Sequence, residues 1–174
     1  MMTEQPTTPM LLAVLEDTLV AEFRGYESLV ALTKDERRLL PDGDVKALLA
    51  LIGQKEHLLD EIDHLERKRQ AIIADWARLE GHLEPPANLL SMLSDLDPAV
   101  ARRLDHLRDG ILVLIEQQRD LARVNRLLVN AALSKIQAVR DFLINLCDTP
   151  RGYQPAGATL PAPSRISLAV EQLA

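Results

Sequence analysis

The chain has 174 residues, a formal net charge of −6 and 47% hydrophobic residues, whereas aromatic residues make up only 3%. A negatively charged protein is not attracted to phosphate backbones or to anionic membrane surfaces, so we expect neither nucleic-acid binding nor membrane insertion. A core with so few rings must be filled by Leu, Ile, Val and Ala, which is typical of helical bundles. The composition therefore predicts an all-α fold.

The cysteine content and the N-terminus predict a cytoplasmic protein. A single cysteine, Cys147, cannot form an intrachain disulfide, which agrees with a reducing compartment. Residues 1–9 contain no Lys or Arg, so they lack the basic region of a signal peptide. The sequence also has no run of about 18 apolar residues that would predict a transmembrane helix.

The first half of the chain is predicted to form a helical hairpin. The first helix is expected over residues 9–39, with Thr8 as its N-cap, and it ends at the Pro-Asp-Gly segment 41–43. Asp44 is the expected N-cap of a second helix over residues 45–80. Because the connection is so short, the two helices are predicted to run antiparallel.

A linker with one or two helical turns near residues 88–93 leads to a third helix, predicted over residues 98–148. Asp97 is its expected cap, and Pro98 suits the first helical position. Eleven of fourteen positions in steps of four and three are apolar, which predicts a heptad seam against other helices. The seam runs Val100, Leu104, Leu107, Ile111, Leu114, Gln118, Leu121, Asn125, Leu128, Ala132, Lys135, Val139, Phe142 and Leu146.

These elements together predict an elongated bundle of three long helices over residues 1–148, with the antiparallel hairpin packed on a longer third helix. At 1.5 Å per residue the third helix is roughly 75 Å long and the second roughly 54 Å. The end of the third helix is therefore expected to extend past the hairpin. An uncovered apolar stripe is a candidate site for a protein partner. Its residues are Val139, Phe142, Leu143 and Leu146.

Residues 149–174 are predicted to form a flexible tail. Four prolines and two glycines within residues 149–163 exclude a packed core there. A short amphipathic helix is predicted near residues 164–173, but it is too short to be stable alone and is expected to fold on a partner. Its apolar face contains Ile166, Val170 and Leu173.

One segment has the spacing of a metal site. Glu61 and His64 match the Glu-x-x-His spacing of di-iron helical bundles, and His57 and Asp60 share their helix face. A di-iron site needs a second such pair, and His106 has no acid three residues before it. We therefore predict a solvated polar face and no metal.

No enzyme class is indicated by the sequence. Cys147 has no histidine within forty residues, so we interpret it as a thiol that packs at the end of a helix. The seven glycines form no phosphate-binding or dinucleotide-binding loop. The sequence thus predicts no catalytic site and no cofactor, and it favours a protein that acts by binding another protein.

Two sets of polar residues on the third helix leave alternatives open. The stripe of Arg119, Arg123 and Arg126 indicates either ion pairs across helices or a site for an acidic partner. The acids considered for such pairs are Glu56, Asp60 and Glu61. The polar seam residues Gln118, Asn125 and Lys135 either fix helix register and oligomeric state or mark where the seam is open to a client.

Three stretches give the chain a resemblance to a known family. The first is the hairpin, with its Asp-Gly-Asp turn at 42–44 and the segments 48–59 and 65–69. The second is the segment Asn-Arg-Leu-Leu-Val-Asn at 125–130, and the third is Tyr-Gln-Pro-Ala-Gly at 153–157, which is similar to a Tyr-x-x-x-Gly element. In these parts and in their order the chain resembles FlgN, the family of flagellar type III export chaperones.

The resemblance implies a specific role. Members of this family bind the hook-associated proteins FlgK and FlgL in the cytoplasm, keep them unassembled and deliver them to the export gate. Client binding is associated with the C-terminal region, and the tail tyrosine, which corresponds to Tyr153, with docking to the gate protein FlhA.

Two other classes remain as alternatives. The first is a structural or adaptor coiled-coil protein, whose seam is closed by homodimerisation. The second is a helical-bundle enzyme, for which no site is found.

Overall fold

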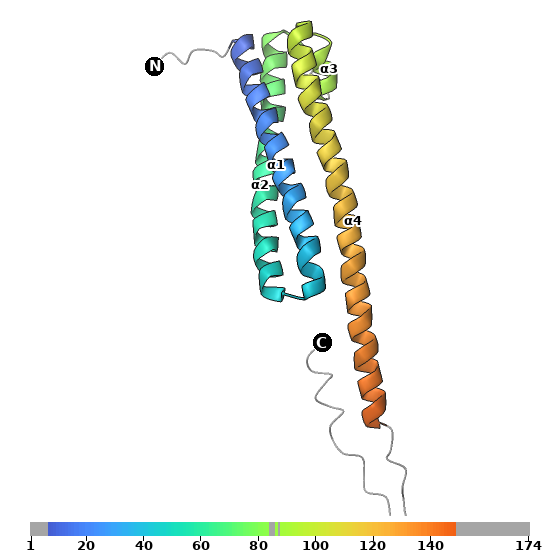
Figure 1. Cartoon of the computed structure of the whole chain (residues 1–174). Coiled ribbons are helices and arrows are strands. Elements are labelled where there is room, and N and C mark those ends of the chain that lie inside the picture. Colours follow the sequence, from blue (N-terminus) through green and yellow to red (C-terminus); the bar gives the residue numbers. More distant parts are fainter. Residues whose placement is uncertain (1–6, 84–85, 87, 149–174) are drawn as a thin grey trace, which may run out of the picture. The chain divides into compact units, whose positions relative to one another are not determined.

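The computed structural model describes residues 7–83, 86 and 88–148, and regular structure in these residues is entirely helical (Figure 1). The predicted all-α fold is confirmed. A short helix, α3, is present in addition to the three long ones, where one or two helical turns were expected. The helices are α1 (Thr8–Asp42), α2 (Val45–Leu79), α3 (Leu89–Leu93) and α4 (Pro98–Asp148).

The chain divides into two compact units, residues 1–132 and residues 133–174. The first unit contains α1, α2, α3 and the first part of α4, and the end of α4 belongs to the second. The domain boundary predicted after residue 148 stays a prediction.

The start of α1 differs from the prediction by one residue. Thr7, not Thr8, is the N-cap, and its side chain makes no capping hydrogen bond. Thr8 is already helical, and its hydroxyl donates instead to Glu80 Oε1 at 2.8 Å. The reason for the error is tertiary, because this hydroxyl binds an acid just beyond the end of α2.

The turn between α1 and α2 follows the predicted chemistry. α1 continues through Pro41 to Asp42, and Gly43 caps it with a left-handed backbone at φ 66°. That conformation strains any residue with a Cβ atom, so glycine is required there. Asp44 caps α2 as predicted, since its carboxylate accepts a hydrogen bond from the Ala47 N–H at 3.0 Å.

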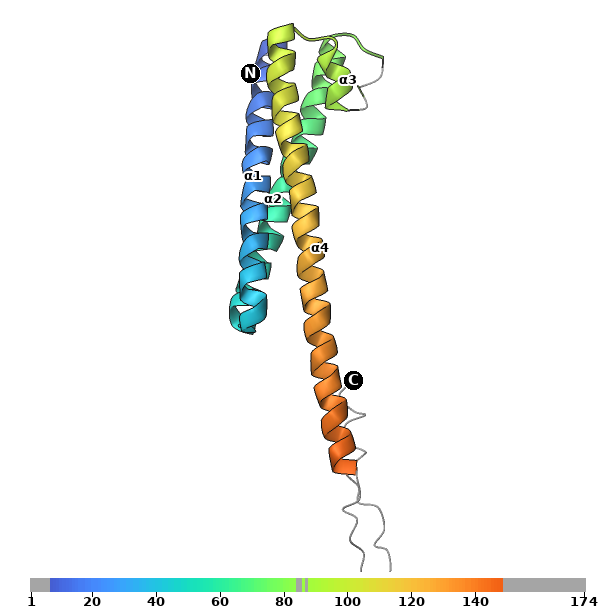
Figure 2. The ribbon, with the colours of Figure 1, turned by 45° about the vertical axis from the view of Figure 1, so that its right-hand side comes forward.

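Contacts within the first unit give the directions of the helices. Glu22 binds Arg69 and Glu36 binds Lys55, so partner numbers fall along α2 as they rise along α1. The two helices are therefore antiparallel neighbours, and Figures 1 and 2 show them side by side. Glu16 binds Arg103, and Asn125 donates to the Thr33 carbonyl. This part of α4 therefore runs parallel to α1.

The core is concentrated at one end of the first unit, where α3 lies beside the C-terminal end of α2 and the start of α4 (Figure 2). Burying these aliphatic side chains fastens α3 and the first half of α4 to the hairpin. The buried residues are Leu11, Leu15, Leu19, Ile72, Ile73, Trp76, Ala77, Leu89, Met92, Leu104 and Ile111.

Two helical glycines lie in opposite environments, and we expect alanine to have opposite effects at them. A Cβ atom at Gly110 would meet Phe23 Cε2 at 2.8 Å, whereas a Cβ at Gly53 would have no neighbour within 4 Å. Gly53→Ala should raise the free energy of unfolding by about 1 kcal/mol through helix propensity. Gly110→Ala should lower it by about 1 kcal/mol, because the ring must move. Urea unfolding measures both, and shifts of the same sign would contradict the packing seen at Phe23.

Candidate functional site

The end of α4 carries exposed apolar side chains. Every residue from 126 to 147 is exposed. Within the second unit, the exposed hydrophobic residues that share one side of the helix are Leu133, Ile136, Val139, Phe142, Leu143 and Leu146, and this set is called the α4 apolar face. The four residues predicted for the site are 53% (Val139), 63% (Phe142), 52% (Leu143) and 62% (Leu146) exposed.

Helix geometry makes this face amphipathic. Ile136, Val139, Leu143 and Leu146 follow one another at spacings of three and four residues, which places them on one side of a helix. The opposite side carries the polar residues Ser134, Gln137, Asp141 and Asn145. A water-exposed helix that keeps a polar side and an apolar side is built to pack against another surface.

Two members of the face were missed at the sequence level. Leu133 and Ile136 are 52% and 65% exposed, but neither lies on the seam in steps of four and three. They lie on its flank, so the apolar stripe is wider than a two-stranded coiled-coil seam. Counting apolar residues at a period of 3.6 would have included them.

The other predicted site residues belong to the C-terminal segment. Ile166, Val170 and Leu173, expected on a tail helix, and Tyr153, expected to contact the export gate, lie outside the described residues.

A polar cluster in the first unit joins three helices around Asn125, which is 3% exposed. Its Nδ2 donates to the Thr33 carbonyl at 2.9 Å and to Glu36 Oε2 at 2.8 Å. Lys55 Nζ lies 2.9 Å from the same Glu36 oxygen. Such a buried polar group specifies which residues of α1, α2 and α4 stand opposite one another, so the register role of Asn125 is supported. Lys135, in contrast, is exposed.

An ion pair with a buried acid, Glu22, links α1 and α2 nearer the core. The side chain of Glu22 is 3% exposed, and Arg69 Nε donates to its two oxygens at 3.0 and 3.2 Å. Burial raises the pKa of Glu22, and Arg69 offsets part of that increase. Next to this pair the Tyr26 hydroxyl donates to Glu66 at 3.0 Å. Burial, helped by Glu66, raises the pKa of Tyr26 to about 12.

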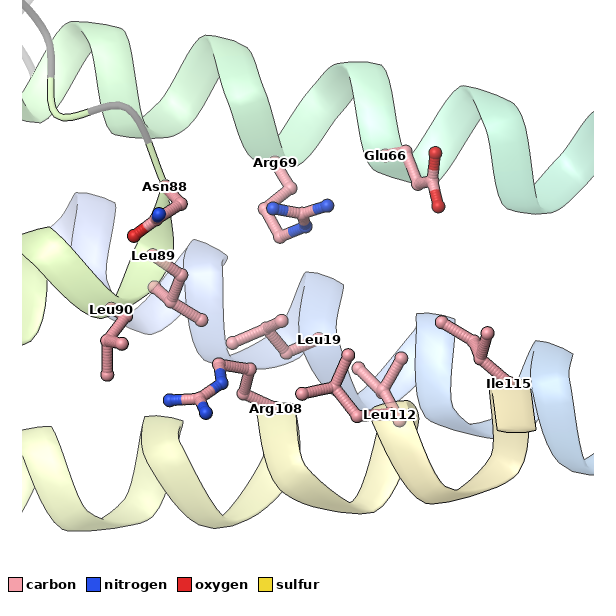
Figure 3. Close-up of a pocket in the computed structure, with 10 residues that line it drawn as sticks. Leu19, Glu66, Arg69, Asn88, Leu89, Leu90, Arg108, Leu112 and Ile115 are labelled. Atoms are coloured by element: carbon pink, nitrogen blue, oxygen red, sulfur yellow. The ribbon is translucent and has the colours of Figure 1, made fainter. Parts of the chain in front are cut away.

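A cavity of about 330 Å³ lies beside this pair, between α2 and α4 (Figure 3). Glu66 and Arg69 reach it from α2, and Arg108 and Leu112 reach it from α4. Its lining is mostly aliphatic, and its charged groups are Glu66, Arg69, which pairs with Glu22, and Arg108, which pairs with Asp105 and Asp109. Such a recess suits an apolar group.

The predicted polar face on α2 has the geometry of a solvated surface. His57 Nε2 lies 3.4 Å from Glu61 Oε1, and both side chains are more than half exposed. Within residues 7–83, 86 and 88–148, no three His, Cys, Asp or Glu side chains are grouped to hold a metal ion. The predicted packing role of Cys147 is wrong, because its side chain is exposed.

The ion pairs considered for the arginine stripe are absent from the part of the chain that the structure describes. Arg123 pairs with Asp120 of its own helix at 3.1 Å. Arg119 and Arg126 are exposed and have no carboxylate within ion-pair distance among these residues. Among the described residues, the predicted pairing with acids of α2 is therefore wrong, and the alternative of an acidic partner stays a prediction.

None of the helices that the structure describes is long and apolar enough to cross a membrane.

Comparison with known proteins identifies the family. No curated protein and no solved structure matches the chain. The model of the family described as FlgN protein matches residues 10–161, a range that contains α2, α3, α4 and all but the first two residues of α1. Because this match covers most of its length, the chain belongs to the FlgN family.

Proposed function

We propose that this chain is a cytoplasmic chaperone that holds hook-associated proteins of the FlgK and FlgL type and delivers them to the type III export gate protein FlhA. Membership of the FlgN family indicates a role as a flagellar export chaperone. The clients, the gate and the compartment are our proposal, and they rest on the resemblance together with the exposed surface of α4.

The observation that carries the proposal is the α4 apolar face. A chaperone for segments that form helices only after assembly must present an apolar helical surface in place of the missing partner. Six large hydrophobic residues, each more than half exposed, stand on one side of α4 without a covering element in the described part of the second unit. Exposed apolar surface of this kind marks a site for a protein partner.

The energetics suit reversible capture. Burying one aliphatic side chain contributes roughly 1.5–3 kcal/mol, and ordering the client helix opposes much of the total. We propose that Ile166, Val170 and Leu173 of the tail add a second apolar edge to the client site. The resulting affinity is moderate, as a chaperone that must release its client requires.

The bundle has a supporting role in this proposal. The antiparallel hairpin packs on the first part of α4, which has 51 residues against 35 in α1 and in α2 and is the longest of the described helices. The core and the polar cluster at Asn125 hold the first part of α4 to the hairpin, and the proposed client site belongs to the second unit by itself.

Charged substitutions on the α4 apolar face are expected to weaken client capture. Phe142→Asp or Leu146→Asp places a carboxylate where the client needs an apolar contact, so affinity should fall at least about ten-fold. Titration of purified hook-associated protein, followed by calorimetry, measures this change. Gln137→Asp, on the opposite side of the same helix, is the matched control and should bind normally. Unchanged binding by both face variants would place the client site elsewhere.

The tail tyrosine is expected to act in delivery and not in capture. Tyr153→Ala should leave the affinity for the hook-associated protein within about two-fold, because the client site lies on α4. It should reduce binding to the cytoplasmic part of FlhA and lower secretion of the client. The two measurements separate the roles, and a loss of client binding by Tyr153→Ala would contradict this assignment.

A homodimeric coiled coil is the second candidate, since two copies of the α4 apolar face can also cover one another. Sedimentation of the wild type and of Phe142→Asp decides between the two. A dimer that Phe142→Asp dissociates, together with no measurable client binding, would favour the structural protein over the chaperone.

A further inference from the structure

One side of α2 is covered at its C-terminal end and open at its N-terminal end. Ile73 is 5% exposed in the core, and Glu66, seven residues earlier, lines the cavity next to α4. Continuing in steps of seven, Leu59, Ile52 and Val45 are 47%, 42% and 65% exposed. Residues seven apart lie on nearly the same side of a helix. This side of α2 is therefore buried at Ile73 and exposed from Leu59 to Val45.

This exposed stripe, named here the α2 open face, contains Val45, Leu49, Ile52 and Leu59. These four side chains are large and aliphatic and belong to the first unit, and the exposed acids Glu56 and Asp63 interrupt the same side of α2. All four are at least 42% exposed, although the polar cluster around Asn125 brings α4 to the nearby Lys55.

The neighbouring side of α4 is basic. Ile115, like Arg108 and Leu112, lines the cavity from α4 in Figure 3. Steps of four, three and four residues lead from Ile115 to Arg119, Ala122 and Arg126, so these residues continue the side of α4 that faces α2. Arg119 and Arg126 are exposed and, among the residues described, have no acidic partner.

We propose that the α2 open face, together with Arg119 and Arg126, is a second docking surface, which binds an amphipathic helix with acidic residues along one edge. The apolar side of that helix packs on Leu59, Ile52 and Val45. Its carboxylates pair with the two arginines. Apolar contacts beside complementary charge are the usual pattern of a helix bound in a groove.

The cavity adds an anchor at one end of this surface. It has a volume of about 330 Å³, and its wall includes Leu112, which is 50% exposed. One large apolar side chain of the partner can enter it. Interfaces commonly concentrate their binding energy in one buried apolar contact of this kind.

Charge favours a foreign helix over a second copy of this chain. From Arg119 to Arg126 the helix carries three arginines and one aspartate, although the whole chain has a net charge of −6. A two-fold contact places the same surface on both sides, so it would add two further arginines to the interface. An acidic helix neutralises them instead.

This surface is distinct from the client site proposed above. It uses residues 45–126, whereas the α4 apolar face uses residues 133–146, and the two share no residue. A chain with both surfaces can hold a client on one and a second protein on the other. The failure of either proposal therefore leaves the other standing.

The probe for this surface is a synthetic three-heptad peptide with leucine on its apolar side and glutamate along one flank. A fluorescein label reports binding to the full chain by anisotropy, and a twin peptide carries lysine in place of glutamate. The glutamate peptide should bind about ten-fold more tightly than the lysine peptide. The double variant Ile52→Glu, Leu59→Glu should weaken binding of the glutamate peptide about ten-fold. Arg119→Glu with Arg126→Glu should reverse the preference between the two peptides.

The control variant is Phe142→Asp, which should bind the glutamate peptide as the wild type does. Circular dichroism and melting show whether each variant is folded, and the substituted side chains are exposed, so folding should persist. Three results would overturn the proposal. These are no binding at roughly 100 µM peptide, a loss only in Phe142→Asp, or a wild-type dimer that Ile52→Glu with Leu59→Glu makes monomeric. The last result would show that a second copy covers this face.

Discussion

Leu104→Ala is expected to lower the free energy of unfolding by about 3 kcal/mol or more, a large part of the roughly 5–15 kcal/mol of a typical domain. Leu104 is fully buried and packs in the core with Trp76 and Met92. Its removal leaves a cavity at the place where α4 joins the hairpin and α3. The neighbouring side chains cannot fill this cavity unless a helix moves. The variant therefore loses the transfer free energy of the removed methyl groups and also bears the free-energy cost of the cavity.

Urea unfolding followed by tryptophan fluorescence measures this effect directly, because Trp76 is the only tryptophan and lies in the same core. Leu112→Ala is the matched control on the same helix, since Leu112 is 50% exposed. Its free energy of unfolding should change by less than about 1 kcal/mol. Equal losses in the two variants would mean that α4 is not fastened to the core through Leu104.

Arg69→Met is expected to lower the free energy of unfolding by about 3 kcal/mol at pH 7, because it leaves the Glu22 carboxylate buried without its partner. The Glu22 side chain is 3% exposed, whereas that of Arg69 is 23% exposed and can be replaced by an apolar chain of similar length. Burial already raises the pKa of Glu22, and without Arg69 it should rise further.

The effect has a defined dependence on pH. A raised pKa in the folded state means that Glu22 favours folding below its unfolded pKa and loses this contribution as pH rises through the folded value. The deficit of Arg69→Met relative to the wild type should therefore shrink as the solution is acidified toward pH 4.5, the ordinary value for Glu22. Chemical unfolding at several pH values measures this trend.

Arg67→Met is the control, because Arg67 pairs with Asp63 where both side chains are more than 60% exposed. Its loss should change the free energy of unfolding by less than about 1 kcal/mol and show little pH dependence. A deficit in Arg69→Met that stays constant down to acidic pH would show that Arg69 acts through packing and not through its charge on Glu22.

The Glu22–Arg69 ion pair also shows how much of a contact the sequence predicts. Leu15, Leu19, Glu22 and Tyr26 follow one another at helical spacing, so Glu22 lies visibly on the apolar side of α1. That pattern signals a buried acid, but its partner is 47 residues away along the chain. Many basic residues of α2 share similar spacing, and only the packed hairpin selects Arg69.

The client site was predicted in part for a related reason. Val139, Phe142, Leu143 and Leu146 are apolar in the sequence, and the structure shows them exposed. Apolar spacing alone does not distinguish a helix side that is buried from one that is exposed. Leu104 and Leu146 belong to the same predicted seam, yet the first is fully buried and the second is 62% exposed.

The sequence by itself determined the helices of this protein, because their signals are local. Asp44 as a cap, the glycine at the end of α1 and the apolar period of α4 each act within a few residues, and the structure follows them closely. The family was also recognised from local stretches. Only the tertiary structure decided which sides of the helices are covered. Which helix sides are buried depends on where the first part of α4 packs against α1 and α2. That position is set by many contacts between residues that are far apart in the sequence. For that reason the exposure of Ile52 and Leu59, and the lack of an acidic partner for Arg119 and Arg126 among the described residues, became visible only in the folded chain.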